Sequence, residues 1–108
     1  MKTTKEIANE ILNQLGGNQF IAMTGSKNFG FYEGTPALSM HLTKNKLKAK
    51  YLTITLNSMD TYDVEFSTVN KSLEKTILNK TEGVYCDQLR GLFERLTGLR
   101  TSLTAIYA

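Results

Sequence analysis

The sequence is poor in several features that define whole classes of protein. It has one cysteine, Cys86, and therefore cannot form an intrachain disulfide. It has one proline among 108 residues, which argues against a disordered or linker-like chain. No apolar run approaches the roughly 18 residues that span a bilayer, and residues 1–6 lack the apolar core of a signal peptide. We therefore expect a cytoplasmic domain with no membrane partner.

A strong net charge is also missing. Thirteen Lys and Arg residues against ten Asp and Glu residues give a net charge of +3. Proteins that coat nucleic acid without discrimination are far more basic, so any nucleic-acid site in this chain must come from local clustering. The length of 108 residues, with 41% hydrophobic and 21% charged residues, suits one globular unit. We expect a single domain over residues 1–108.

Periodicity predicts a helix towards each end of the chain. Thr3 and Glu6 have the spacing of a capping box, and apolar residues then recur on one helical face until Gly16. This pattern predicts a helix over about residues 4–15. A second amphipathic pattern predicts a helix over residues 84–97, with Gly98 placed to end it.

Between the helices, the chain reads as strands. Alternation of apolar and polar residues predicts three consecutive antiparallel strands at 37–43, 51–56 and 62–67. Residues 19–24 and 29–32 are also expected to be strands. Residues 69–82 fit either a helical stripe or a fifth strand, and we prefer the strand.

The order of helix, strands and helix predicts an α+β fold. We expect a two-layer sandwich in which an antiparallel sheet of four to five strands is flanked by an N-terminal and a C-terminal helix. The opposite face of the sheet would be open and polar. It would carry Ser39, His41, Thr43, Tyr51, Thr53, Thr55, Asp63, Glu65 and Ser67.

Between two of the predicted strands, four lysines stand at alternate positions: Lys44, Lys46, Lys48 and Lys50. In an extended β-hairpin this spacing would place all four ammonium groups on one side, where they could hold phosphates. The alternative is that the lysines only protect a sheet edge and keep the hairpin soluble. Further cationic candidates for a nucleic-acid surface are Lys27, Arg90 and Arg95, although the arginine spacing spirals around a helix.

Signals for catalysis are weak. Asp60, Asp63 and Glu65 could together hold Mg²⁺ for phosphodiester cleavage, but acidic residues on a strand commonly balance neighbouring lysines. His41 is the only histidine and has no nucleophile or second histidine close to it in the sequence. We expect a protein without catalytic activity, cofactor or metal site. A small metal-dependent nuclease stays open as the lesser alternative.

An aromatic cluster is open to two interpretations. Phe29, Phe31 and Tyr32 could stack on unpaired bases if they are exposed, or they could belong to the core. Gly25-Ser26-Lys27 lacks the order and spacing of a phosphate-binding loop, so we expect no bound nucleotide.

Three stretches carry a resemblance to known proteins: Leu15 to Gly25, Ile54 to Phe66, and Val84 to Leu99. They resemble a family of small uncharacterised proteins encoded by bacterial phages and other mobile genetic elements. The resemblance implies a bacterial or phage-infected host cytoplasm. It also implies a role in replication, transfer, regulation or counter-defence of a mobile element, and it brings no functional residues.

Two functions follow from these observations. The first is a non-enzymatic binding module that contacts nucleic acid through the basic hairpin. The alternative is an anti-defence type of inhibitor or regulator that binds a host or defence protein through the open sheet face or a sheet edge. No pattern in the sequence indicates the oligomeric state.

Overall fold

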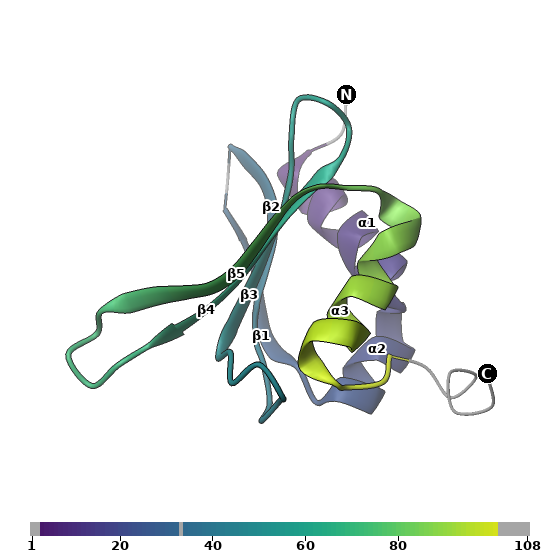
Figure 1. The fold of residues 1–108 in the computed structure, drawn as a ribbon. Coiled ribbons are helices and arrows are strands. Elements are labelled where there is room, and N and C mark those ends of the chain that lie inside the picture. The colour runs from purple at the N-terminus through teal and green to yellow at the C-terminus, as the bar shows by residue number, and fades with distance from the viewer. Residues whose placement is uncertain (1–2, 33, 102–108) are drawn as a thin grey trace.

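A computed structural model describes residues 3–32 and 34–101. Its elements, in chain order, are α1 (Thr4–Leu15), α2 (Gly17–Thr24), β1 (Lys27–Tyr32), β2 (Thr35–His41), β3 (Tyr51–Leu56), β4 (Tyr62–Val69), β5 (Lys75–Val84), the 3₁₀ helix η1 (Cys86–Gln88) and α3 (Leu89–Thr97). The strands form one antiparallel sheet in the order β1-β2-β3-β4-β5, and the α-helices lie on one side of it (Figure 1). The predicted α+β sandwich is confirmed.

The first helix begins and ends as predicted. The Thr3 side chain accepts a hydrogen bond from the backbone N–H of Glu6 at 3.1 Å, which caps α1. Ile11 and Leu15, one helical turn apart, are fully buried against the sheet layer. Gly16, at φ 130°, ends the helix.

The strand predicted at residues 19–24 is wrong, because these residues form the helix α2. Gly16 and Gly17 both have positive φ, which lets the chain change direction and start a second helix at once. Phe20 and Thr24, one turn apart, are buried, and the Phe20 ring packs edge-on against Phe93 of α3 at 5.0 Å. A short apolar run fits a strand or a helix equally well, and this tertiary contact favours the helix.

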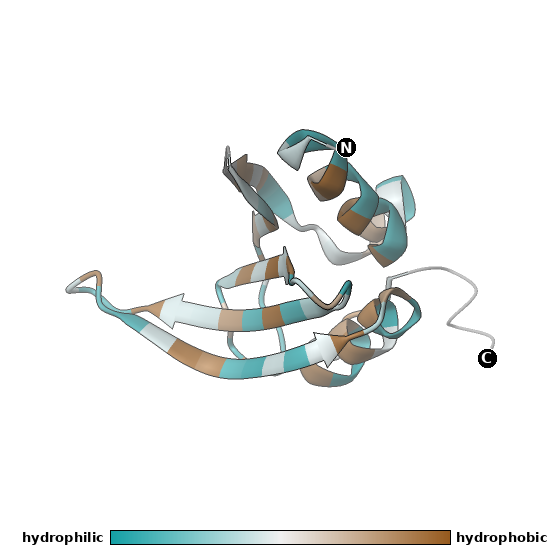
Figure 2. Cartoon of the chain, turned by 90° about the horizontal axis from the view of Figure 1, so that it is seen from above, coloured by the Kyte–Doolittle hydropathy of each residue, from teal (hydrophilic) through white to brown (hydrophobic). Residues whose placement is uncertain are grey.

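The remaining strands occur close to the predicted ranges, although β2 ends at His41, so Leu42 and Thr43 belong to the following loop. The apolar residues of the central strands face the helices and are buried: Leu38, Met40, Leu52, Ile54, Val64 and Phe66. Directly paired residues share a face, as in the pairs Leu38 with Ile54 and Ile54 with Val64. Figure 2 shows the resulting alternation of apolar and polar bands along the strands.

In the uncertain segment 69–82, a turn at residues 70–74 is followed by β5 from Lys75, so the preferred assignment as a strand is confirmed for residues 75–82. The helix predicted from residue 84 begins later, because Val84 still pairs with Tyr62 in the sheet. Gln88 accepts a hydrogen bond from the N–H of Tyr85 at 3.0 Å, and this contact starts η1 before α3. None of the helices in the described ranges has the length and apolar character that a membrane crossing requires.

Part of the β4–β5 hairpin projects from the body of the molecule (Figure 1). We call residues 68–79 the arm, because none of them is buried. Its apolar side chains Leu73, Ile77 and Leu78 are 84%, 52% and 37% exposed. The arm therefore presents apolar surface outside the core.

Candidate functional site

The three connections between β2 and β5 contain the same five-residue turn, led by an asparagine: Asn45–Ala49, Asn57–Thr61 and Asn70–Glu74. In each turn the asparagine carbonyl accepts a hydrogen bond from the N–H of the fourth residue, at 3.1, 3.2 and 3.0 Å. Its side-chain Oδ1 accepts from the N–H of the fifth residue, at 3.2, 3.2 and 3.0 Å. The fourth residues, Lys48, Asp60 and Leu73, have φ near +60°. The asparagine side chain thus holds the fourth residue of the turn in the left-handed conformation, which usually favours glycine.

The first of these turns shapes the lysine loop, residues 42–50. The loop is not the extended segment that the alternate spacing predicted, since the turn at 45–49 places Lys46 second and Lys48 fourth within it. Asn45 is buried, and its Nδ2 donates to the carbonyls of Thr43 and Ala49, both at 2.8 Å. The Lys46 N–H donates to the carbonyl of Thr97 at 2.8 Å, which fixes the loop to the end of α3. The lysines therefore stand on an ordered scaffold.

The four lysines of the loop are all exposed. Lys50 donates from Nζ to the carbonyl of Val69 at 3.4 Å. Within the part of the chain that the structure describes, the ammonium groups of Lys44, Lys46 and Lys48 have no acidic partner. The sequence from residue 34 to residue 59 contains no Asp or Glu, so neither flanking strand compensates these charges. The loop is a local concentration of positive charge on a nearly neutral protein.

The other three cationic candidates, Lys27, Arg90 and Arg95, lie in different parts of the structure. Lys27 is exposed and pairs in register with His41, at the end of β2 where the loop begins. Arg90 donates from Nε to the hydroxyl of Thr101 at 3.2 Å. Arg95 lines a hollow between α3 and β5. Lys27 thus joins the loop end of the sheet, whereas both arginines belong to the helical layer.

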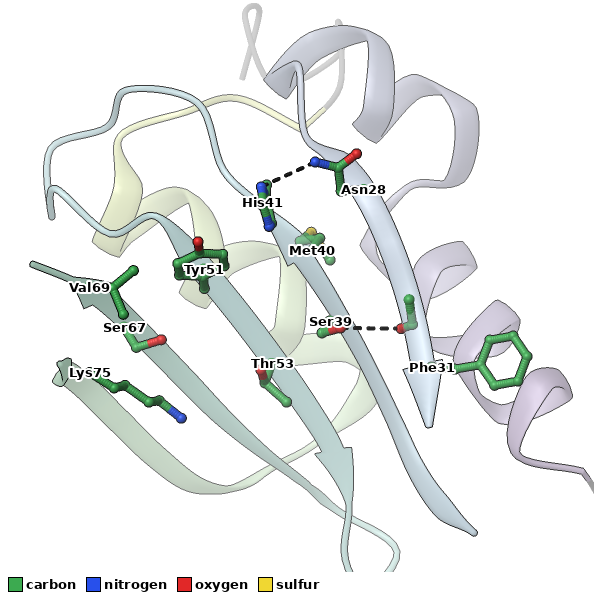
Figure 3. Close-up of a pocket in the computed structure, with 11 residues that line it drawn as sticks. Asn28, Phe31, Ser39, Met40, His41, Tyr51, Thr53, Ser67, Val69 and Lys75 are labelled. Atoms are coloured by element: carbon green, nitrogen blue, oxygen red, sulfur yellow. Dashed lines mark hydrogen bonds between the residues drawn. The ribbon is translucent and has the colours of Figure 1, made fainter. Parts of the chain in front are cut away.

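A hollow of about 480 Å³ occupies the open face of the sheet (Figure 3). Its lining includes Ser39, His41, Tyr51, Thr53, Ser67 and Lys75. Five of these six residues are on the polar face that the alternation predicted, so that part of the sequence interpretation is confirmed. The sequence pattern did not indicate that the face is concave.

His41 and Tyr51 form the last residue pair of β2 and β3 before the lysine loop. Their rings meet edge to face, with centroids 4.6 Å apart and planes at 87°. The Asn28 side-chain amide donates to Nδ1 of His41 at 3.2 Å, which leaves Nε2 to carry the proton of the neutral ring. An oriented aromatic pair therefore stands where the hollow meets the loop.

The carboxylates considered for Mg²⁺ do not come together. Asp63 accepts a hydrogen bond from the Asn57 amide at 3.0 Å, and Glu65 forms an ion pair with Lys75 at 2.6 Å. Among residues 3–32 and 34–101, no three His, Cys, Asp or Glu side chains are placed to hold a metal ion. Asp63 pairs with Thr55 near the far end of β3 from the loop. The lysine loop and Asp63 therefore lie towards opposite ends of β3.

Of the aromatic residues singled out from the sequence, Phe31 lines the hollow and Phe29 does not. Phe29 is half-buried and packs against the core. Phe31 is 46% exposed at the margin, and its ring points away from the middle of the sheet (Figure 3). The side chain of Tyr32 lies outside the described part of the structure. Sequence reasoning counted Tyr51 only as part of a polar face, although its place directly after the last lysine was a usable signal.

The site thus consists of an ordered lysine loop, a polar hollow and an aromatic pair between them. The lining of the hollow comes from β1 to β5, and sheet pairing together with the contact between the lysine loop and α3 brings these parts together. We compared the chain with known proteins on sequence and on structure. No protein family, curated protein or solved structure matches it.

Proposed function

We propose that the protein is a non-enzymatic binding module that holds nucleic acid through the lysine loop. One observation carries the proposal: the exposed ammonium groups of Lys44, Lys46 and Lys48 have no acidic partner in the described structure. Lysine acts on phosphate as a mobile point charge, so such a loop suits the sugar–phosphate backbone and does not read sequence. In keeping with the resemblance to phage proteins, the module would serve a mobile element in a bacterial or phage-infected host cytoplasm.

The rigidity of the loop supports this function. The buried Asn45 amide and the contact with Thr97 hold the backbone of the loop before any ligand binds. Binding then costs less conformational entropy than it would for a disordered basic segment. The lysine side chains remain free to adjust to the spacing of phosphates.

Fluorescence anisotropy with labelled single-stranded and double-stranded oligonucleotides tests the proposal. The variant Lys44→Gln/Lys46→Gln/Lys48→Gln removes three charges and leaves Lys50 bonded to Val69. We expect it to weaken binding on the order of tenfold or more near 0.1 M salt. The matched control is Lys5→Gln/Lys71→Gln/Lys80→Gln, which removes three exposed charges elsewhere.

The control separates a local site from general charge. Equal losses in the two triple variants would mean that only the net charge of the protein matters. Absence of binding by the unaltered protein at low salt would refute the proposal outright. A loss confined to the loop variant would support it.

The arm favours a second candidate, an inhibitor or regulator that binds a host or defence protein. Leu73, Ile77 and Leu78 expose apolar surface along β5, which is an edge strand of the sheet in the described structure, and exposed apolar patches often mark protein contacts. A pull-down from nuclease-treated bacterial lysate tests it. Capture of one defined protein that is lost in Ile77→Thr/Leu78→Thr but kept in the lysine-loop variant would favour this candidate.

A further inference from the structure

The hollow on the sheet face lies directly beside the lysine loop. His41 and Tyr51, which border the loop at its two ends, both line the hollow. Lys50 reaches across to the carbonyl of Val69, which also lines it. If the phosphates of a bound strand lie on the loop, the neighbouring groups of that strand can therefore reach the hollow.

The lining of the hollow suits an uncharged, flat, polar group. It contains no Asp or Glu, and Lys75, its one lysine, is already paired with Glu65. The hydroxyls of Tyr51, Thr53 and Ser67 make no side-chain hydrogen bond to another described residue. These hydroxyls can donate to or accept from a ligand. The hollow thus offers neutral hydrogen-bonding groups, whereas the neighbouring loop offers charge.

Tyr51 supplies an aromatic surface whose orientation is already set. Its ring meets the His41 ring at 87°, and the Asn28 amide in turn fixes the His41 ring. Figure 3 shows Tyr51 between His41 and the Ser67 and Val69 side chains. Because the side chain of Tyr51 is already restricted, a planar ligand that stacks on its ring loses little side-chain entropy, which lowers the entropic cost of binding.

We infer that the hollow takes an unpaired base of a single strand whose phosphates lie on the lysine loop. A base combines a π-face with donors and acceptors along its edge, and these match the Tyr51 ring and the free hydroxyls. The volume of about 480 Å³ lies within the range of ligand pockets. In a duplex the base faces are covered by their neighbours, so only single-stranded nucleic acid can use this site. The inference rests on the proposed nucleic-acid function.

The test compares three probes by fluorescence anisotropy: a single strand, an abasic strand of the same length and phosphate number, and a duplex. We expect the protein to bind the single strand roughly tenfold more tightly than the abasic strand, because stacking contributes at each bound base. The variant Tyr51→Ile removes the aromatic ring but keeps a residue that suits a strand. It should lower the affinity for the single strand to that for the abasic strand and leave the latter unchanged.

A matched control lies on the same strand. Thr55→Ile also places isoleucine on the open face of β3, but Thr55 is not part of the hollow, so single-strand binding should be unaffected. Thr53→Val provides a milder second test, since it removes one hydroxyl of the hollow at nearly constant volume. Thermal unfolding followed by circular dichroism checks that each variant is folded.

The outcomes separate this inference from the proposed function. If the single and abasic strands bind equally and Tyr51→Ile changes nothing, the base site is refuted, while the lysine loop can still hold phosphates. Equal binding of the two strands is also the result expected if the hollow binds a side chain of a partner protein and no base. If none of the probes binds at low salt, the proposed function fails, and the base site fails with it.

Discussion

At the scale of single residues, Asn45 helps to hold the backbone that carries the lysines, although it has no charge itself. Its side chain is buried and forms three hydrogen bonds: Nδ2 donates to the carbonyls of Thr43 and Ala49, and Oδ1 accepts from the N–H of Ala49. A side-chain amide has two donors and one acceptor oxygen, so this geometry uses all of its groups. Together with the hydrogen bond from the Lys46 N–H to the carbonyl of Thr97, these bonds set the backbone that carries Lys44, Lys46 and Lys48.

We predict that Asn45→Ala lowers the free energy of unfolding by about 2–3 kcal/mol, because it leaves buried backbone groups without partners. Chemical denaturation measures the change. The control is Asn70→Ala in the exposed turn of the arm, where water can replace the lost bonds and about 1 kcal/mol or less is expected. Similar losses at the two positions would contradict the importance of burial at Asn45.

At the scale of elements, the repeated asparagine turn explains how three hairpins close without glycine. The fourth turn position has φ of 63° at Lys48, 60° at Asp60 and 63° at Leu73. A left-handed conformation costs a non-glycine residue about 1–2 kcal/mol. Leu73 is 84% exposed and recovers little of that cost through burial. An exposed leucine in a strained conformation at the tip of the arm would be explained if the arm binds a host or defence protein, as the second candidate function requires.

Leu73→Gly should therefore raise the free energy of unfolding by up to about 1 kcal/mol, as it relieves the left-handed strain. Lys71→Gly in the same turn, at a position without positive φ, should lower it by roughly 0.5 kcal/mol. Thermal unfolding of both variants gives the comparison. Changes of the same sign would show that the left-handed geometry is not what destabilises Leu73.

A helix or strand could be predicted from the sequence where its pattern of apolar and polar residues is long and regular. The helix at 4–15 and the strands around Leu38, Ile54 and Val64 have long patterns with one apolar face, so periodicity identified them. Residues 19–24 have no such length, and the burial of Phe20 against Phe93 decided for a helix. The asparagine turns were missed because their signal is a side-chain hydrogen bond that the sequence pattern does not display.

At the scale of the whole molecule, the sandwich is one-sided. All of its α-helices within the described residues cover one face of the sheet (Figure 1). The hollow occupies the other face (Figure 3). Exposed lysines gather in the loop that joins β2 and β3, and Asp63 pairs with Thr55 near the other end of β3. A polyanion would therefore bind with a preferred position, even though the net charge is only +3.

The salt dependence of binding should report this local charge. For a single strand we predict that log K falls with log salt with a slope of about −2, as expected for three phosphate contacts. The variant Lys44→Gln/Lys46→Gln/Lys48→Gln should have a slope close to zero. Anisotropy titrations at several KCl concentrations measure both slopes. An unchanged slope in the variant would place the phosphate contacts elsewhere.

The sequence by itself determined the class of fold, the polar character of one sheet face and the concentration of lysines between β2 and β3. These follow from local periodicity and composition, which depend only on near neighbours in the chain. Tertiary structure decided that residues 17–24 are helical, that the lysines stand on an ordered turn, and that Tyr51 and His41 share a hollow with Ser67. Those outcomes depend on packing and pairing between distant segments, and no local pattern contains that information.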